Sequence, residues 1–218
     1  MIVGEGFIER QWTFKQIEKK LYYMAKTPSD ALATDLIKHV QKYNVNLNSK
    51  SWVKQPLIHA IDMNGVRAFN LLLSSGVNIT DYVDQYLDDL RDEKLKKKFR
   101  DSLQLYKHTL IPAMNLKVDT IRDNLEANSA TVKFQINAKD YWGLTPLHHA
   151  CKCIHETLIR LLLTKGADRT VKDRVKKKAP LEYMLSLSDT EILENNQNVY
   201  LSEIHDLFDA YEIEVNQK

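Results

Sequence analysis

The strongest constraint on this chain is a helix–turn–helix pattern that occurs twice, 90 residues apart, in two stretches that align without a gap. Both copies begin with Pro-Leu, continue through an alanine and a triple leucine, and end at a glycine. Proline is favoured at the first position of a helix, and glycine is favoured directly after the last one. The pattern therefore predicts antiparallel helix pairs at Pro56–Ser74 and Thr145–Thr164.

The second copy carries the more specific sequence. Its repeat-like residues are Gly143, Thr145-Pro146-Leu147-His148, Ala150, His155, Leu161-Leu162-Leu163 and Gly166-Ala167-Asp168, within a stretch in which Asp140 lies 33 residues before Asp173. This stretch resembles the ankyrin repeat, whose period is about 33 residues. In the first copy Val53, Gln55 and Ile58 stand at the glycine, threonine and histidine positions. The first copy therefore resembles a degenerate ankyrin repeat.

The resemblance implies an all-α fold, namely an ankyrin-repeat solenoid with degenerate repeats and an irregular central region. Six glycines and five prolines among 218 residues also argue against a turn-rich all-β chain. We expect one ankyrin-repeat domain over residues 1–218. Its expected units are a clear repeat at 140–172, a degenerate repeat at 50–79, and weak units at 13–46, 80–139 and 173–212.

The weak units at the two ends are predicted from fainter patterns. Thr13–Lys26 is expected to form a first helix, and the helix after it ends at Asn44, which stands in the glycine position. Pro180-Leu181 repeats the Pro-Leu start after a one-residue insertion, and a final amphipathic helix is expected over Leu201–Phe208.

The central region, Ile79–Gln135, fits the repeat least well. Spaced apolar residues across Tyr82–Tyr106 predict two helices, and Pro112 lies 34 residues before Pro146, which predicts the start of a worn repeat there. Asn128–Phe134 is expected to be loop or extended chain. Five or six stacked units account for the length, and a three-plus-two arrangement around an insertion is the alternative.

Side chains of the kinds that bind zinc crowd into one short stretch, namely His148, His149, Cys151, Cys153 and His155. The resemblance assigns His148 to a backbone hydrogen bond between repeats, Cys151 to a small core position and His155 to the start of the second helix. Too few ligands remain for a zinc site, so we predict neither a metal nor a cofactor. No Gly-rich phosphate loop, HExxH or GxSxG motif occurs in the chain, so we predict neither catalysis nor a small-molecule substrate.

Two basic segments, Lys94–Arg100 and Lys172–Lys178, suggest an alternative function. Clustered lysines and arginines bind phosphate on nucleic acid or on anionic lipid. The other interpretation is that both segments are solvated surface, because acidic residues lie close to Lys94–Arg100 and aromatic residues are not interleaved. Residues 179–218 hold nine acidic residues and one basic residue, against 20 acidic and 30 basic residues in the rest of the chain. The acidic C-terminal segment could therefore offset the positive charge of the remainder.

Ankyrin repeats bind other proteins through their concave face, using hairpin fingertips and exposed positions of the first helices. Carried over onto this sequence, these positions are Tyr141, Trp142, Leu144, Lys152, Cys153 and Lys165 in the clear repeat and Ser51, Trp52, Lys54, Asp62, Met63 and Ser75 in the degenerate one. Tryptophans at similar hairpin positions of the two copies favour aromatic binding anchors. The alternative is that Trp52 and Trp142 pack against neighbouring hairpins or against the central insertion. The predicted partner is another protein.

An intracellular, cytoplasmic location is expected. Cys151 and Cys153 are too close in sequence to suit a disulfide, and the chain has no apolar run near the roughly 18 residues of a membrane span. The first residues lack the features of a signal peptide. Worn, lysine- and asparagine-rich ankyrin chains also resemble virulence effectors of intracellular bacteria and poxviral host-range proteins, which implies a host-interaction role in the host cytoplasm. No F-box-like tail is recognisable.

Overall fold

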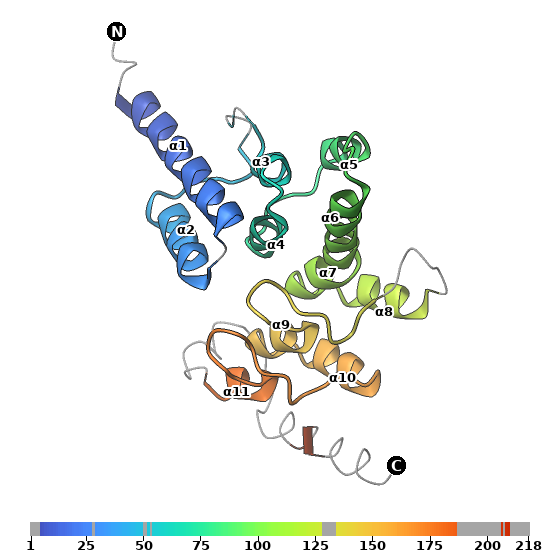
Figure 1. Ribbon diagram of the computed structural model, residues 1–218. Coiled ribbons are helices and arrows are strands. Elements are labelled where there is room, and N and C mark those ends of the chain that lie inside the picture. Colours follow the sequence, from blue (N-terminus) through green and yellow to red (C-terminus); the bar gives the residue numbers. More distant parts are fainter. Residues whose placement is uncertain are drawn as a thin grey trace. The chain divides into compact units, whose positions relative to one another are not determined.

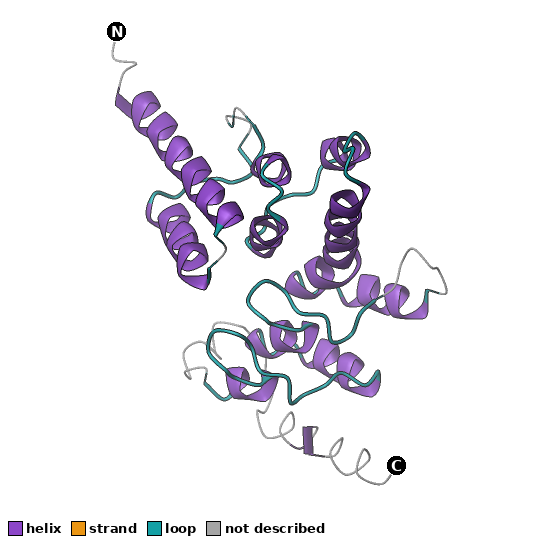
Figure 2. Cartoon of the chain, viewed as in Figure 1, coloured by secondary structure: helices purple, strands orange, loops and turns teal. Residues whose placement is uncertain are grey.

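The structure is a computed structural model that describes residues 5–27, 29–49, 52, 54–127, 134–186, 206, 208 and 209. Every regular element within these ranges is helical (Figures 1 and 2), which confirms the predicted all-α fold. The chain divides into two compact units, Met1–Ser102 and Leu103–Lys218. The expected single ankyrin-repeat domain stays a prediction.

The N-terminal unit is built from successive helix pairs. These are α1 (Glu5–Lys26) with α2 (Asp30–Lys42), α3 (Pro56–Asp62) with α4 (Val66–Ser74), and α5 (Asp81–Asp88) followed by α6 (Glu93–Leu105), whose last three residues belong to the C-terminal unit. Helix α1 packs against α2, α3 and α4 (Figure 1). The predicted pair at Pro56–Ser74 and the two helices predicted within Tyr82–Tyr106 are confirmed. Helix α1 begins earlier than the predicted start at Thr13.

A left-handed residue follows the second helix of each clear pair. The φ angle is 47° at Asn44, 81° at Gly76 and 84° at Gly166. The N–H of the next residue then reaches five residues back, as that of Val77 does to the Leu72 carbonyl at 3.2 Å. This bond closes a Schellman cap, for which glycine or asparagine is suited. The predicted glycine positions, with Asn44 as a substitute, are confirmed.

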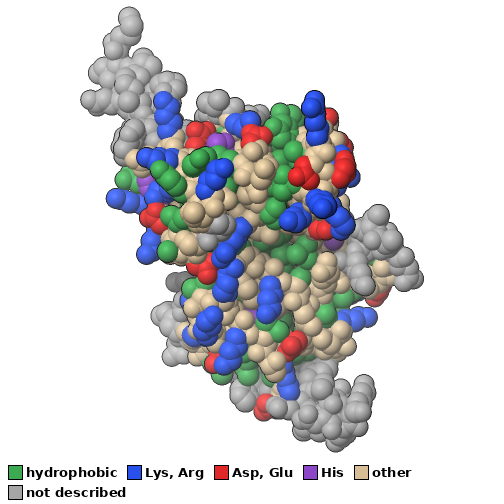
Figure 3. All heavy atoms as spheres, viewed as in Figure 1, with side chains coloured by type: hydrophobic (Ala, Val, Ile, Leu, Met, Phe, Trp, Pro, Cys, Tyr) green, Lys and Arg blue, Asp and Glu red, His purple; other side chains and the backbone are tan. Residues whose placement is uncertain are grey.

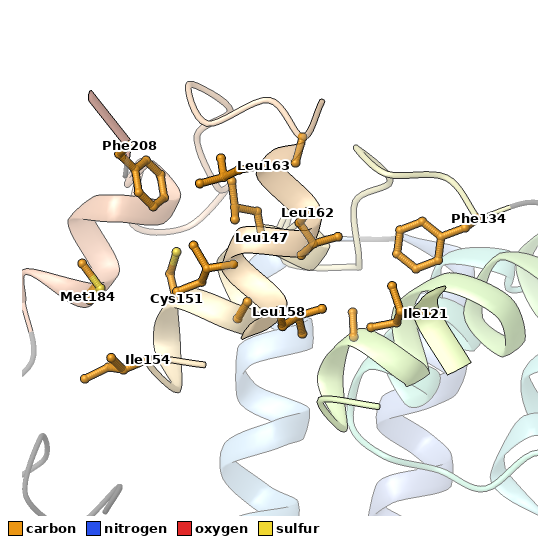
Figure 4. Close-up of a cluster of buried hydrophobic side chains, with 14 residues drawn as sticks. Ile121, Phe134, Leu147, Cys151, Ile154, Leu158, Leu162, Leu163, Met184 and Phe208 are labelled. Carbon is orange, nitrogen blue, oxygen red and sulfur yellow. The ribbon is translucent and has the colours of Figure 1, made fainter. Parts of the chain in front are cut away.

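The C-terminal unit packs its helices around α9. Its elements are a π-helical turn (Tyr106–Leu110), α7 (Ile111–Met114), α8 (Val118–Glu126), α9 (Pro146–Lys152), α10 (Glu156–Thr164) and α11 (Pro180–Met184). Helix α9 packs against α7, α10 and α11, and α10 also contacts α8. The core between these helices includes the buried side chains of Ile121, Leu147, Cys151, Leu158, Leu162 and Met184 (Figure 4). The predicted pair at Thr145–Thr164 is confirmed.

The prediction that a worn repeat starts at Pro112 is wrong by about one helical turn. The left-handed residues that follow the first helices are Asn64, Leu116 and Ile154, and the N–H groups after them bond to the carbonyls of Ala60, Pro112 and Ala150. Pro112 therefore occupies the position of these two alanines, in the last turn of its helix. The position of Pro56 and Pro146, at the start of a helix, lies four residues earlier.

A proline inside a helix removes one backbone hydrogen bond and crowds the preceding turn. The chain accommodates Pro112 through the π-helical turn, at whose end the Ile111 N–H bonds to the Tyr106 carbonyl. The His108 carbonyl, which an N–H at position 112 would reach in a regular helix, accepts a hydrogen bond from the Asn124 side-chain amide at 2.8 Å. Helix α8 thus supplies the bond that the proline removes.

The last predicted elements are only partly described. Helix α11 begins at Pro180, as predicted. Most of the helix expected over Leu201–Phe208 lies outside the described residues, but Phe208 is 2% exposed and packs into the core of the C-terminal unit. The loop expected over Asn128–Phe134 also lies outside them, apart from its last residue. Among the described residues, no helix is long and apolar enough to cross a membrane.

Candidate partner-binding site

The hairpin that precedes α9 is folded around the buried carboxylate of Asp140. Its Oδ1 accepts hydrogen bonds from the backbone N–H groups of Trp142 and Leu144, at 2.8 and 2.9 Å. The Asp140 N–H bonds to the Leu144 carbonyl at 2.9 Å, and Oδ2 lies 3.2 Å from Nε2 of His149 on α9. One side chain therefore closes the turn and ties it to the helix behind it.

Gly143 allows the following hairpin to approach this one closely. Its φ angle is +83°, and a Cβ at this position would lie 2.7 Å from the backbone nitrogen of Arg174. That nitrogen donates to the Trp142 carbonyl at 2.9 Å. Another residue at position 143 would strain the turn and push the two hairpins apart.

The following hairpin repeats the arrangement around Asp173. The two carboxylate oxygens of Asp173 accept three backbone N–H groups of the hairpin, at distances between 2.6 and 2.9 Å. The Asp173 N–H bonds to the Lys178 carbonyl, five residues on, whereas Asp140 reaches only four residues on. The hairpin accommodates the additional residue where Lys177 takes a φ angle of 58°. This is the one-residue insertion predicted before Pro180.

His148 links the clear repeat to this second hairpin. Its Nδ1 accepts a hydrogen bond from the Thr145 N–H at 3.0 Å, so the proton is on Nε2, which donates to the Lys178 carbonyl at 3.1 Å. His148 is fully buried. Burial lowers its pKa, and the Lys178 carbonyl and the Asp173 carboxylate oppose this only in part. The predicted hydrogen bond between repeats is confirmed, and it requires a neutral imidazole.

Tyr141 and Leu144 are not exposed fingertips, since their exposed fractions are 5% and 6%. The Arg174 guanidinium lies over the Tyr141 ring, with its carbon 4.5 Å from the ring centroid, and the Trp142 ring contacts Tyr141 edge-on at 4.9 Å. The Tyr141 N–H donates to the Tyr106 hydroxyl at 3.2 Å. The expectation that Tyr141 and Leu144 are exposed is therefore wrong, because the neighbouring hairpin covers Tyr141 and the fold of the turn buries Leu144. Trp142 is half-buried.

The other predicted positions of the clear repeat are accessible. Lys152, the last residue of α9, is exposed, and Cys153, which caps it, is half-buried. Lys165, which caps α10, is exposed. Together with Trp142, these residues are the part of the predicted site that a partner can reach without rearrangement of the fold.

In the degenerate repeat, Trp52 is also covered. It is 8% exposed and donates through Nε1 to the Asn46 carbonyl at 3.1 Å. The expectation of an exposed fingertip at Trp52 is therefore wrong, because the ring packs against the preceding loop. Lys54 is exposed and Met63 is half-buried. Ser51 lies outside the described residues.

Two tyrosines that no repeat position predicts, Tyr82 and Tyr86 of α5, lie beside the degenerate repeat. The Tyr86 hydroxyl donates to the Asp62 carboxylate, which also pairs with Lys54. Tyr82 is 52% exposed. The signal that indicates these residues is their i, i+4 spacing on the polar face of an amphipathic helix.

A hollow of about 330 Å³ lies at the start of α3 in the same unit. Among its lining residues are Leu47, Asn48, Trp52, Gln55, Asn78 and Thr80. The Asn48 side chain accepts the Asn78 N–H at 2.7 Å and donates to the Gly76 carbonyl at 3.1 Å. This asparagine therefore joins two successive loops, and its polar atoms serve the fold.

The histidine and cysteine residues of the clear repeat have structural roles. Cys151 is fully buried, and burial raises the pKa of its thiol, which disfavours the thiolate that metal binding or nucleophilic attack requires. His155 precedes α10, and its Nδ1 accepts the Leu158 N–H at 3.3 Å. In the part of the chain that the structure describes, no three His, Cys, Asp or Glu side chains are grouped to hold a metal ion. Metal-free protein stays a prediction.

Both basic segments use part of their charge internally. Lys176 and Lys178 place their ammonium groups 5.4 and 5.9 Å from the ring centroid of Tyr183. The ion pairs of the other segment join Lys96 to Glu93, Lys97 to Asp101 and Arg100 to Asp88. Figure 3 shows acidic side chains beside lysines and arginines over α5 and α6. The Lys94–Arg100 segment is therefore not a uniformly positive surface.

Short helix pairs with left-handed caps, joined by aspartate-centred hairpins, define a helical repeat protein. Residues 142–171 match the family model described as the ankyrin repeat. The chain is 29% identical over 150 residues to a fowlpox virus (strain NVSL) protein provisionally named ankyrin repeat protein FPV223, in an alignment that covers 60% of this chain and 99% of the relative. A second fowlpox virus protein, provisionally named ankyrin repeat protein FPV230, is 27% identical over 170 residues, which covers 72% of this chain and 87% of the relative.

The chain therefore contains an ankyrin repeat within residues 142–171, and its similarity to the two fowlpox virus proteins supports an ankyrin-repeat protein. Ankyrin repeats generally mediate interactions between proteins and are generally not catalytic.

Proposed function

We propose that the protein binds another protein through the ends of its first helices and the adjoining hairpins, and that it catalyses no reaction. The observation that carries this proposal is the equivalence of two accessible positions. Asp62 and Met63 at the end of α3 correspond to Lys152 and Cys153 at the end of α9, 90 residues later. Each helix packs through its buried face within its own unit, so the accessible residues of each unit are held in place before a partner binds.

The proposed contact residues differ in part from those that the repeat pattern predicts. Trp142, Lys152, Cys153 and Lys165 in the C-terminal unit and Lys54 and Met63 in the N-terminal unit are the accessible ones. Tyr141, Leu144 and Trp52 are buried, so they support the hairpins on which the contact residues stand. A substitution at these three positions acts on binding through the fold.

We further propose an intracellular role in the interaction between a pathogen and its host. The two fowlpox virus relatives support this proposal, because both are provisionally named ankyrin repeat proteins of a virus. The half-exposed Cys153 thiol and the buried Cys151 thiol are compatible with a reducing cytoplasm.

The test compares proteins retained from a host-cell extract by the tagged chain, after nuclease treatment. We expect one protein to be retained by the wild type and by Thr157→Ala, an exposed control on α10, but not by a Trp142→Ala/Lys152→Glu variant. Titration with that purified protein is then expected to show a loss of about 1–2 kcal/mol for Trp142→Ala. Equal retention by all three chains contradicts the proposed surface.

The second candidate function is electrostatic binding of phosphate on nucleic acid or anionic lipid. It is favoured by the exposure of Lys172 and Lys177 on the second hairpin. A Lys172→Glu/Lys177→Glu variant tests it against an oligonucleotide and anionic vesicles at two salt concentrations. Binding that falls steeply with salt and is lost in this variant, while Trp142→Ala binds normally, supports this function over the first.

A further inference from the structure

Helix α5 of the N-terminal unit carries two tyrosines on its accessible face. Val83 and Leu87 on its other face are fully buried. The rings of Tyr82 and Tyr86, one turn apart, have centroids 6.0 Å apart and are tilted by 55°. Helix α5 contacts α3, so the two rings adjoin the accessible end of the degenerate repeat.

Tyr86 is held in place by a polar network. Its hydroxyl donates to the Asp62 carboxylate, which also binds Lys54, and the Lys54 ammonium lies 6.0 Å from the Tyr86 ring centroid. Burial alone would raise the pKa of Asp62, but the hydrogen bonds from Lys54 and Tyr86 outweigh it and lower the pKa. The carboxylate is therefore ionised, and the Tyr86 ring is oriented before any partner arrives.

Tyr82 differs from the other exposed tyrosines of the described residues. Tyr22, Tyr23 and Tyr43 each lie close to a lysine of this chain, at 5.7, 6.0 and 5.1 Å from the ring centroid. Within the described ranges, no lysine or arginine lies over the ring of Tyr82, although this ring is the most exposed of the four at 52%. The ring face of Tyr82 is therefore available to a cation from another molecule.

The chain segment that carries this ring is acidic. Residues 78–90 contain four aspartates and no lysine or arginine. Asp88 pairs with Arg100, and the charge of Lys54 is balanced by Asp62. Asp89, three residues after Tyr86 on the same face of the helix, is exposed. An open aromatic ring and an exposed carboxylate on one helix suit guanidinium groups, which stack on aromatic faces and pair with carboxylates.

Resting on the proposed function, we infer that the α5 face, defined by Tyr82, Tyr86, Asp62 and Asp89, binds an arginine-bearing basic segment of the partner protein. One arginine side chain of the segment stacks on Tyr82, and another pairs with Asp89, which lies two helical turns further along. The fixed ring of Tyr86 and the carboxylate of Asp62 border the bound segment. Lysine fits less well, because its compact, strongly hydrated ammonium group forms no planar stack and no bidentate pair.

The test uses the full chain and two fluorescent peptides, one of alternating arginine and serine and one of alternating lysine and serine, with binding followed by fluorescence anisotropy at physiological salt. We expect the arginine peptide to bind more tightly than the lysine peptide. Tyr82→Ala is expected to weaken arginine-peptide binding by about tenfold, and Asp89→Asn by about threefold. The matched control is Tyr22→Ala, because Tyr22 is also a largely exposed tyrosine, at 46%.

Equal binding of the two peptides overturns the inference, as does unchanged binding by Tyr82→Ala or an equal loss in Tyr22→Ala. Sedimentation velocity tests whether a second copy of this chain binds the α5 face instead. A wild-type dimer that Tyr82→Ala dissociates would show that it does, and would also overturn the inference. Retention of a host protein that depends on Trp142 but not on Tyr82 leaves the proposed function standing and removes this extension alone. Circular dichroism melts of each variant show that the fold is intact.

Discussion

The guanidinium carbon of Arg174 lies 4.5 Å from the centroid of the Tyr141 ring, so that a side chain from one hairpin covers an aromatic side chain of the previous one. The same two hairpins are joined by the bond from the Arg174 N–H to the Trp142 carbonyl. Tyr141 therefore belongs to the packing between hairpins.

Tyr141→Ala is expected to destabilise the protein by about 2–4 kcal/mol, because it removes a buried ring and the surface on which Arg174 stacks. Urea unfolding followed by circular dichroism measures the change. The control is Tyr22→Ala, whose side chain is 46% exposed and whose loss is expected to cost little. Equal effects of the two substitutions would contradict the packing role.

His148→Gln is expected to reveal a dependence of stability on pH. Because burial lowers the pKa of His148 in the native state, the unfolded chain binds a proton that the native chain does not, below the unfolded-state pKa of about 6.5. The stabilisation by His148 is therefore complete above that pH and is lost as the pH falls through and below it. We expect the variant to be about 1–2 kcal/mol less stable near neutrality, with a smaller difference at about pH 5.5.

The measurement is the difference in unfolding free energy between wild type and variant across this range. The pKa of His39 is also lowered, chiefly by burial. Its contribution is present in both chains and cancels in the difference. A difference that stays constant with pH would show that His148 is not held neutral.

Leu162→Ala is expected to cost about 2–5 kcal/mol, because this fully buried side chain packs between helices and its removal leaves a cavity. Val175→Ala, at a hairpin position that is 55% exposed, serves as the control and is expected to change stability by less than about 0.5 kcal/mol. Thermal melts of the three chains provide the comparison. Similar melting temperatures for Leu162→Ala and the wild type would be incompatible with the core described.

Asn124→Ala is expected to cost about 1–3 kcal/mol, because it leaves the His108 carbonyl without the amide that binds it. In a Pro112→Ala background, a backbone N–H is restored within reach of that carbonyl, and the same substitution is expected to cost about 1 kcal/mol less. A double-mutant cycle measured by urea unfolding gives the coupling. A coupling of zero would mean that Asn124 does not compensate for the proline.

The helix pairs were predictable from the sequence because their signals are local. No knowledge of tertiary contacts is needed to interpret Pro146 at a helix start, Gly166 after a helix end, or the leucine stripe between them. Asn44 at φ 47° shows that even a worn position keeps a residue that tolerates the left-handed conformation. The insertion before Pro180 followed from the same spacing.

The register at Pro112 was not predictable in this way. Proline is accepted at the start of a helix without help, but in the last turn it needs a donor from elsewhere, and that donor, Asn124, lies on the next helix. The predicted exposure of Tyr141 was wrong for a related reason. Its ring is covered by Arg174, which lies 33 residues later in the chain. Tyr82 was missed because α5 carries no repeat motif, although its helical spacing indicated an accessible face.

Substitution affects the two ends of the hydrogen bond between His148 and Lys178 differently. One end is an imidazole that a single substitution removes, whereas the other is a main-chain carbonyl that every residue possesses. The bonds of Asp140 to two N–H groups and of Asn124 to the His108 carbonyl have the same character. A neighbouring unit can therefore change most of its side chains and still accept these hydrogen bonds, provided that its backbone conformation is unchanged. Worn repeats beside one well-preserved repeat are what this arrangement permits over evolutionary time.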